Sequence, residues 1–132
     1  MATRPAERRF WERIPAACRR ALQRAASTTV GELAVLTAPS AAALDREPLW
    51  RDPAAAGLVA WGVAPNGDLW VYDVTASGPH VGLLSHDLVW EGQGPHREAF
   101  APVAGTVAEV LRRAVAGTAP IDFSEARDAA KG

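Results

Sequence analysis

The 132-residue sequence predicts an α+β domain, a central antiparallel β-meander with N-terminal helices and a C-terminal helix packed on it. Three observations lead to this prediction. Apolar residues recur at helical spacing near the N-terminus, short apolar runs alternate with turn residues over 57–91, and a capped amphipathic segment follows at 106–117. One domain is expected over 1–117, followed by a polar tail over 118–132 with one short turn after Ser124.

The N-terminal segment is expected to form two short helices. Its apolar residues fall on one helical stripe, made by Phe10, Ile14, Cys18, Leu22 and Ala25. Proline disfavours the α conformation in the residue before it but is tolerated at the first helical position. Pro15 therefore divides the segment into a helix near 5–13 and a second helix over 15–26.

The connector before the meander is expected to hold a short strand at 30–37 and a short helix at 40–47, capped by Ser40 or Thr37. Pro48 and Pro53 end this regular structure, and the residues between them are assigned to a loop.

Strands are expected at 57–63, 69–74, 81–84 and 88–91. Asn66-Gly67 between the first two is a strong hairpin signal, because both residues accept positive φ, and Asp68 is expected to close that turn. In 69–74, Trp70, Tyr72 and Val74 alternate with Leu69 and Val71, so both faces of this strand should be covered.

The C-terminal helix is marked at both ends. Thr106 and Glu109 form a capping box, and Gly117 is the expected stop. Its predicted buried stripe consists of Val107, Val110, Leu111, Ala114 and Val115.

Composition excludes several classes of protein. The single cysteine, Cys18, excludes an intrachain disulfide or zinc ribbon, and its place on the apolar stripe favours a buried structural thiol. No apolar run is long enough to span a bilayer, and no secretory signal is visible, so no membrane association and a cytoplasmic location are expected.

The net charge of −1 conceals an asymmetry. Residues 1–24 carry seven arginines and two glutamates, or +5, whereas the remainder carries seven basic and 13 acidic residues, or −6. The arginines are interpreted as the solvated face of amphipathic helices. An adaptor that binds nucleic acid through them is an alternative, but Glu7 and Glu12 dilute the charge and no nucleic-acid partner is expected.

Four motifs, in order, resemble the SUKH superfamily, the domain of fungal SMI/KNR-type regulators and many bacterial immunity proteins. They are the Ile14-Pro15 opening of a helix, the hairpin over 61–73 with its Gly67-Asp68 turn, Gly78-Pro79 before a strand with His86-Asp87 after it, and the closing helix over 107–115. Together they cover about residues 10–117.

This resemblance implies a non-catalytic module that binds a protein partner, a cognate toxin domain such as a nuclease, and covers its active site. A basic nuclease groove calls for an acidic face. Asp68, Asp73, Asp87, Trp90 and Glu91 are the predicted contributors to that face. No catalytic residue, metal or cofactor is expected, and the protein should be a monomer or weak dimer.

Two other functions remain as alternatives, a regulatory scaffold or adaptor, and a small metal-dependent hydrolase that uses His80, His86 and His96. The histidine spacing matches no standard zinc signature. The competing interpretation places these histidines at turns and strand ends, with His86 hydrogen-bonded to the hairpin. Ser85-His86-Asp87 is no sign of a catalytic triad, whose members converge from separate elements.

Overall fold

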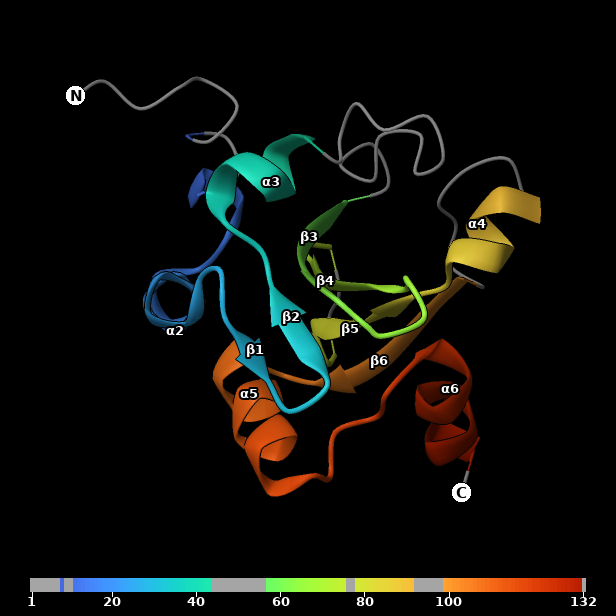
Figure 1. The fold of residues 1–132 in the computed structure, drawn as a ribbon. Coiled ribbons are helices and arrows are strands. Elements are labelled where there is room, and N and C mark those ends of the chain that lie inside the picture. Colours follow the sequence, from blue (N-terminus) through green and yellow to red (C-terminus); the bar gives the residue numbers. More distant parts are fainter. Residues whose placement is uncertain (1–7, 9–10, 44–56, 76–77, 92–98, 132) are drawn as a thin grey trace.

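A computed structural model describes residues 8, 11–43, 57–75, 78–91 and 99–131 of the chain. Six antiparallel strands form one sheet in sequence order, β1 to β6, and helices pack around it (Figure 1). The predicted α+β class is confirmed, with its meander and its helices towards both ends of the chain.

Helix α2 (Ala16–Ala25) begins directly after Pro15, whose carbonyl accepts the N–H of Arg19 at 2.9 Å. Cys18 and Leu22 are its buried residues, and Ile14 is buried just before it. The predicted break at Pro15 and the stripe from Ile14 to the partly buried Ala25 are therefore confirmed. Residues 11–13 are helical before that break, whereas Phe10 and most of the helix predicted near 5–13 lie outside the described residues.

Helix α3 (Ala38–Ala43) begins earlier than predicted. The backbone N–H of Ser40 donates to Thr37 Oγ1 at 3.2 Å, so Thr37, one of the two predicted caps, holds the first turn. The rest of the predicted helix and the loop with Pro48 and Pro53 lie outside the described residues.

The short strand or connector predicted at 30–37 does contain a strand, but the sequence did not predict its partner. The segment folds into a hairpin of β1 (Thr29–Val30) and β2 (Leu33–Val35). Gly31, with a φ of +60°, makes the turn between them. This glycine was the sequence signal for the turn.

The meander contains β3 (Leu58–Val63), β4 (Leu69–Asp73) and β5 (Val81–Leu84), as predicted. The predicted fourth strand at 88–91 is instead helix α4 (His86–Glu91). Ser85 Oγ accepts the N–H of Leu88 at 3.2 Å, so the Ser-His-Asp run that was expected to end a strand starts a helix.

The last strand, β6 (Phe100–Ala104), was not predicted. It pairs with β5 and forms one edge of the sheet. Proline is disfavoured inside a sheet, but an edge strand tolerates Pro102 because its outer side needs no hydrogen bond to a neighbouring strand.

Helix α5 (Val107–Ala116) has both predicted ends. Thr106 Oγ1 accepts the N–H of Glu109 at 3.2 Å, and Gly117 ends the helix with a φ of 75°. Val107, Val110 and Ala114 are buried, but Val115 is 78% exposed, so its predicted burial is wrong.

Residues 118–132 were predicted as a polar tail, but most of the segment after residue 122 forms helix α6 (Phe123–Lys131). Phe123 and Ala126 are buried in the main core, and α6 packs against β6. Alanine and charged residues on its outer side hid this short apolar stripe.

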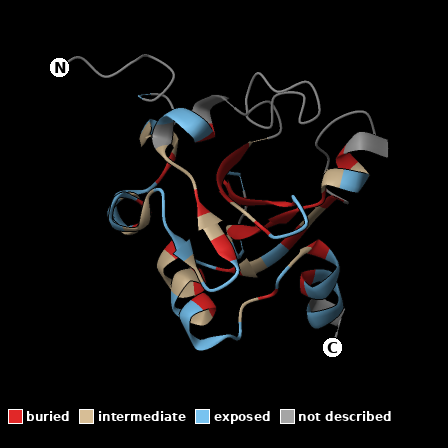
Figure 2. Ribbon diagram, viewed as in Figure 1, coloured by how far each residue is buried: buried red, intermediate tan, exposed pale blue. Residues whose placement is uncertain are grey.

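Both faces of the sheet are covered, and Figure 2 shows the buried residues concentrated in β3, β4 and β5. On one face, Trp70 and Tyr72 belong to the main core with residues of α2, α5 and α6. On the other, Leu69 and Val71 pack in a second cluster with Val89 of α4. The predicted alternation is thus confirmed for residues 69–72, but Val74, predicted on the same face as Trp70 and Tyr72, lies beyond β4 and is 41% exposed. No described helix has the length and apolar character needed to cross a membrane.

Candidate functional site

Asp68, at the end of the β3–β4 turn, is buried, and its carboxylate connects three parts of the chain. Oδ1 accepts the backbone N–H of His86 at 3.0 Å and the ring Nδ1–H of His86 at 2.5 Å. Oδ2 accepts the Asn66 side-chain amide at 3.1 Å and the backbone N–H of Phe123 at 2.9 Å. We call Asn66, Asp68, His86 and Phe123 the Asp68 cluster; it ties the turn to the first residues of α4 and α6.

Neighbouring residues of the turn fix the position of the Asp68 carboxylate. Asn66 Oδ1 accepts the backbone N–H of Asp68 at 3.0 Å, and the carbonyl of Asp68 accepts the N–H of Ala64 at 2.8 Å. Gly67 adopts a φ of +96° between them, a conformation that favours glycine. Asp68 therefore closes the hairpin, as predicted, and His86 bonds to that hairpin, as its structural interpretation required.

The environment of Asp68 keeps it ionised. Burial alone would raise its pKa, because a buried carboxylate loses hydration. Hydrogen bonds from the backbone of His86 and Phe123, and from the side chains of His86 and Asn66, outweigh burial and hold the pKa below its ordinary value of 3.8. Its carboxylate is thus a structural anion at neutral pH.

Asp73 has a similar role at the end of β4. It is buried, and its Oδ1 accepts the backbone N–H of Thr75 at 2.9 Å and the Thr75 hydroxyl at 2.8 Å. The carbonyl of Asp73 accepts Nδ1–H of His80 at 3.0 Å. Asp68 and Asp73 were both predicted on a partner-binding face, but their buried carboxylates bond within the domain and do not form an accessible acidic surface.

The other three predicted binding residues, Asp87, Trp90 and Glu91, share helix α4. The Asp87 side chain is 78% exposed, with Oδ1 3.3 Å from Nε2 of His86. The side chains of Trp90 and Glu91 lie outside the described part of the chain. Among the predicted binding residues whose side chains the structure describes, Asp87 is therefore the accessible one.

The three histidines do not meet as the hydrolase hypothesis requires. His80 precedes β5 and His86 follows it, so an extended strand separates them by roughly 15–20 Å. His96 lies outside the described residues. Within those residues, no group of three or more histidine, cysteine, aspartate or glutamate side chains could hold a metal ion.

Cys18 and Tyr72 lie in the main core. Cys18 is buried, as predicted for a structural thiol. Burial raises the pKa of the Tyr72 hydroxyl above its ordinary value of 10.0, and the negative charges that Cys18 and Asp73 can carry act in the same direction. Tyr72 therefore stays neutral and serves the packing of β4.

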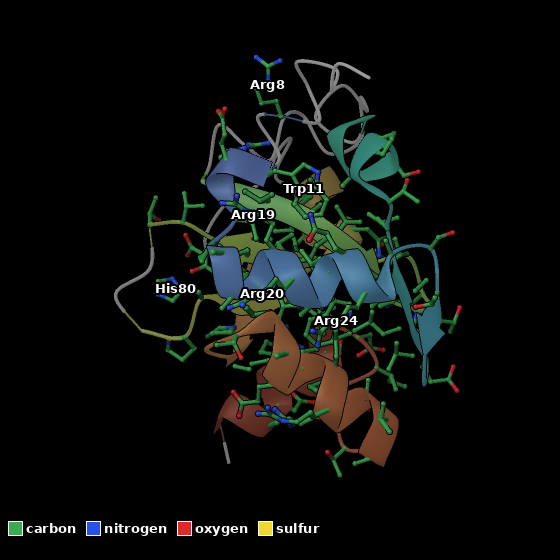
Figure 3. The ribbon with its side chains drawn as sticks, turned by 90° about the vertical axis from the view of Figure 1, so that its left-hand side faces the viewer. Arg8, Trp11, Arg19, Arg20, Arg24 and His80 are labelled. Atoms are coloured by element: carbon green, nitrogen blue, oxygen red, sulfur yellow. The ribbon has the colours of Figure 1, made fainter. Side chains whose placement is uncertain are left out.

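The arginines of α2 are divided between its sides (Figure 3). Arg20 and Arg24 are exposed, whereas Arg19 is partly buried and donates through Nη2 to the carbonyl of Ile14 at 3.1 Å. Glu12 is exposed in the helical segment before α2. This distribution differs from the concentrated positive face that nucleic-acid binding uses.

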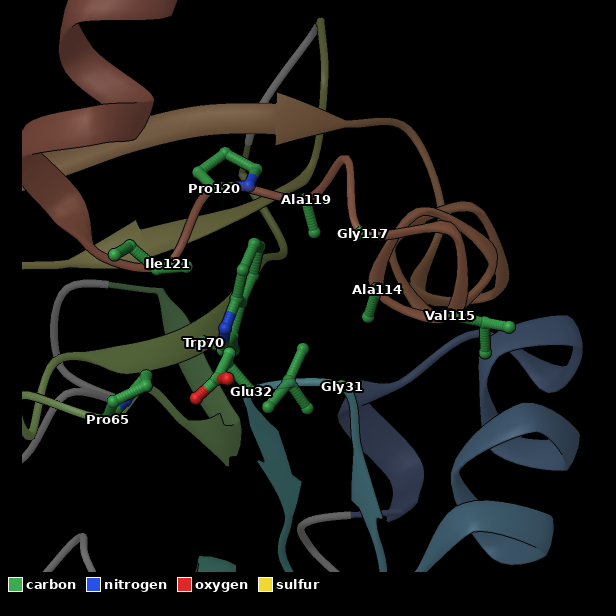
Figure 4. Close-up of a pocket in the computed structure, with 11 residues that line it drawn as sticks. Gly31, Glu32, Pro65, Trp70, Ala114, Val115, Gly117, Ala119, Pro120 and Ile121 are labelled. Atoms are coloured by element: carbon green, nitrogen blue, oxygen red, sulfur yellow. The ribbon is translucent and has the colours of Figure 1, made fainter.

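A recess of about 300 Å³ lies where α5 ends, and the sequence did not predict it. Figure 4 shows its three sides, the β1–β2 hairpin tip, the last turn of α5, and the connector from α5 to α6, with Trp70 of β4 between them. We call this hollow the α5 recess. It is lined by Gly31, Glu32, Leu33, Pro65, Trp70, Ala114, Val115, Gly117, Ala119, Pro120 and Ile121.

Two exposed aliphatic side chains line this recess. Val115 is 78% and Ile121 is 47% exposed; the other large apolar side chain exposed among the described residues is Val74, at 41%. One sequence signal was available for Val115: its helix ends at Gly117, two residues later, where little chain remains to cover it. Nothing comparable marked Ile121, whose exposure depends on how α6 docks.

Comparison with known proteins adds no identification. No protein-family model matches the chain, and no curated protein or solved structure matches it at a significant level.

Proposed function

We propose that this chain is a protein-binding module without catalytic chemistry of its own, acting in the bacterial cytoplasm as an immunity protein. It would neutralise a toxin domain, such as a nuclease, by covering its active site. The sequence resemblance supports this proposal through the positions of its motifs. Ile14-Pro15 precedes α2, the Gly67-Asp68 turn joins β3 to β4, and His86-Asp87 begins α4.

The observation that carries the proposal is accessible apolar surface next to a recess. Val115 and Ile121 expose large aliphatic side chains at the α5 recess, although a small domain gains stability by burying such groups. The two side chains flank the hollow on opposite sides, and exposed apolar residues around a hollow are a feature of protein interaction sites. By contrast, Asp68 and Asp73 are engaged inside the domain.

The accessible acid at the start of α4 supplies a second contact of the kind a basic active site would recognise. Asp87 projects into solvent there, and Glu91 lies one helical turn further along the same helix. Complementary charge across an interface raises the association rate and excludes wrong partners. Asp87 and Glu91 thus remain the proposed acidic part of the binding face, and Trp90 of the same helix remains its proposed aromatic contact.

The test uses the toxin C-terminal domain that the proposal expects to be encoded beside this gene. Co-expression of the full chain should restore growth to cells that express the toxin domain, and calorimetry of the purified proteins should detect a stable complex. Continued growth arrest, no complex, or a neighbouring gene without a toxin would each contradict the proposal.

Charge reversal locates the acidic contact. Asp87→Arg combined with Glu91→Arg should weaken the complex at least tenfold and leave the melting temperature almost unchanged. Glu125→Arg, an exposed position on α6, is the matched control and should bind normally. Equal affinity of all three proteins would remove α4 from the binding face.

A further inference from the structure

We infer that His86 is a proton-dependent switch for the acidic contact at the start of α4. While Nε2 of His86 carries a proton, it binds the carboxylate of Asp87, and loss of that proton releases Asp87 to a basic partner. The inference deepens the proposed function, on which it rests for the identity of the partner. The release of Asp87 is a property of the chain alone and can be measured without a partner.

The buried carboxylate of Asp68 decides which ring nitrogen of His86 changes its state. A carboxylate only accepts hydrogen bonds, and Asp68 Oδ1 lies 2.5 Å from Nδ1 of His86, so Nδ1 donates. The pKa of Asp68 lies below its ordinary value of 3.8, so this acceptor stays ionised over the pH range in which histidine side chains titrate. Nδ1 therefore keeps its hydrogen, and Nε2 is the nitrogen that gains or loses a proton.

Nε2 of His86 lies beside the exposed carboxylate of Asp87. It is 3.3 Å from Asp87 Oδ1, and the His86 side chain is 31% exposed, whereas that of Asp87 is 78% exposed. With a proton on Nε2, the imidazolium ring donates to this oxygen and forms an ion pair. Without that proton, the lone pair of Nε2 faces a carboxylate oxygen, and two acceptors repel each other. The carboxylate of Asp87, which is mostly in solvent, is then released from the ring.

The charged groups of the three elements that meet at His86 are carboxylates. They are Asp68 of the β3–β4 turn, Asp87 of α4, and Asp122 directly before α6, whose Oδ1 accepts the N–H of Glu125 at 2.9 Å. Among the described residues, none of these three carboxylates pairs with an arginine or a lysine. In that part of the chain, the proton on His86 therefore supplies the positive charge that Asp87 meets.

The state of His86 changes the charge that α4 offers to a partner. Loss of the Nε2 proton removes one positive charge beside Asp87 and frees its carboxylate. A basic groove is attracted more strongly to this form, because complementary charges favour an interface and like charges oppose it. Binding of a basic partner should therefore strengthen as the pH rises through the range in which histidine titrates, between about pH 5 and about pH 8.

The first experiment follows the full chain by NMR over this pH range. The side-chain carboxyl carbon of Asp87 should show a step at the pH at which Nε2 of His86 loses its proton. His86→Gln should abolish this step. His80→Gln is the matched control and should leave the step in place, because the His80 ring bonds to the backbone carbonyl of Asp73 at 3.0 Å. An absent step, or one that persists in His86→Gln, would overturn the inference.

The second experiment measures the affinity of the toxin domain by calorimetry at about pH 5.5 and about pH 8. The gain in affinity at the higher pH should be about three- to fivefold larger for the original chain than for His86→Gln, the size expected for one exposed charge pair. His80→Gln should behave as the original chain does. Asp87→Asn leaves the bond between Asp68 and His86 intact and should lose most of this gain, so it tests the inference even if His86→Gln does not fold.

The inference and the proposed function can fail separately. A toxin complex whose affinity changes with pH equally in the original chain, His86→Gln and Asp87→Asn would overturn the switch and leave the immunity function standing. A step at Asp87 that depends on His86, in a chain that binds and neutralises no toxin, would overturn the immunity function and leave the release of Asp87 established.

Discussion

The Asp68 cluster and the α5 recess both include residues of the β3–β4 hairpin, but the cluster buries a charged group whereas the recess leaves apolar groups exposed. In the cluster, a buried charge receives four hydrogen bonds and offers nothing to solvent. In the recess, to which Pro65 of the same turn contributes, aliphatic side chains stay exposed. The difference teaches that the conspicuous acidic turn stabilises the fold, whereas the less conspicuous apolar residues remain accessible to solvent.

The largest expected effect follows from removing the Asp68 carboxylate at the centre of the cluster. Asp68→Ala leaves the N–H groups of His86 and Phe123 without their acceptor, and we expect a loss of about 3–4 kcal/mol in the free energy of unfolding. Asp87→Ala, at an exposed carboxylate, should cost less than about 0.5 kcal/mol. Urea denaturation measures both, and similar losses would show that burial of Asp68 has little effect.

The next effect concerns the wall of the recess. Gly31→Ala places a Cβ against the carbonyl of Ala114 and also imposes positive φ on alanine, so a loss of about 2–3 kcal/mol is expected. Gly67→Ala, at a φ of +96° with no atom within 4 Å of the new Cβ, carries only the conformational cost of about 1 kcal/mol. The difference between their denaturation midpoints isolates the close approach; equal losses would argue against it.

Low pH should remove the stabilisation that the ionised Asp68 carboxylate gives to the fold. Because the folded pKa of Asp68 lies below its ordinary value of 3.8, the unfolded chain takes up its proton first as the pH falls. The stabilisation is therefore complete well above pH 3.8 and is lost as the pH drops through the lower folded pKa.

Asp68→Asn provides the reference for this effect. At pH 6 the free energy of unfolding of the original chain should be about 2 kcal/mol higher than that of Asp68→Asn, because hydrogen bonds to a charged group stabilise more than hydrogen bonds to an amide. Thermal unfolding should show that gap narrowing below pH 3.8. A gap that stays constant with pH would mean that the charge of Asp68 does not stabilise the fold.

The smallest effect lies in the recess itself. Val115→Thr should change the free energy of unfolding by less than about 0.5 kcal/mol, because the side chain is mostly exposed at the end of α5. Val110→Thr, buried in the same helix, should cost about 2 kcal/mol or more. If Val115→Thr destabilised as much, Val115 would belong to the core.

Local patterns in the sequence were sufficient for β3, β4, β5 and both ends of α5, since the Asn66-Gly67 turn and the Thr106 and Gly117 caps depend on neighbouring residues. They failed where distant contacts decide. The edge position of β6 accommodates Pro102, and α6 is held by packing against β6 and by Asp68. The recess brings together residues from four separate segments, so no single stretch of sequence announces it.

The partners of Asp68 also have a kinetic consequence. His86 is 18 positions and Phe123 is 55 positions further along the chain, so we expect the bonds to His86 to form once β3, β4 and β5 have paired, and the bond to Phe123 only after α6 has docked. Interactions absent from the transition state slow unfolding without speeding folding. Stopped-flow measurements on Asp68→Asn should therefore find faster unfolding and an almost unchanged refolding rate. The buried carboxylate is therefore expected to set the lifetime of the native state by lowering the unfolding rate.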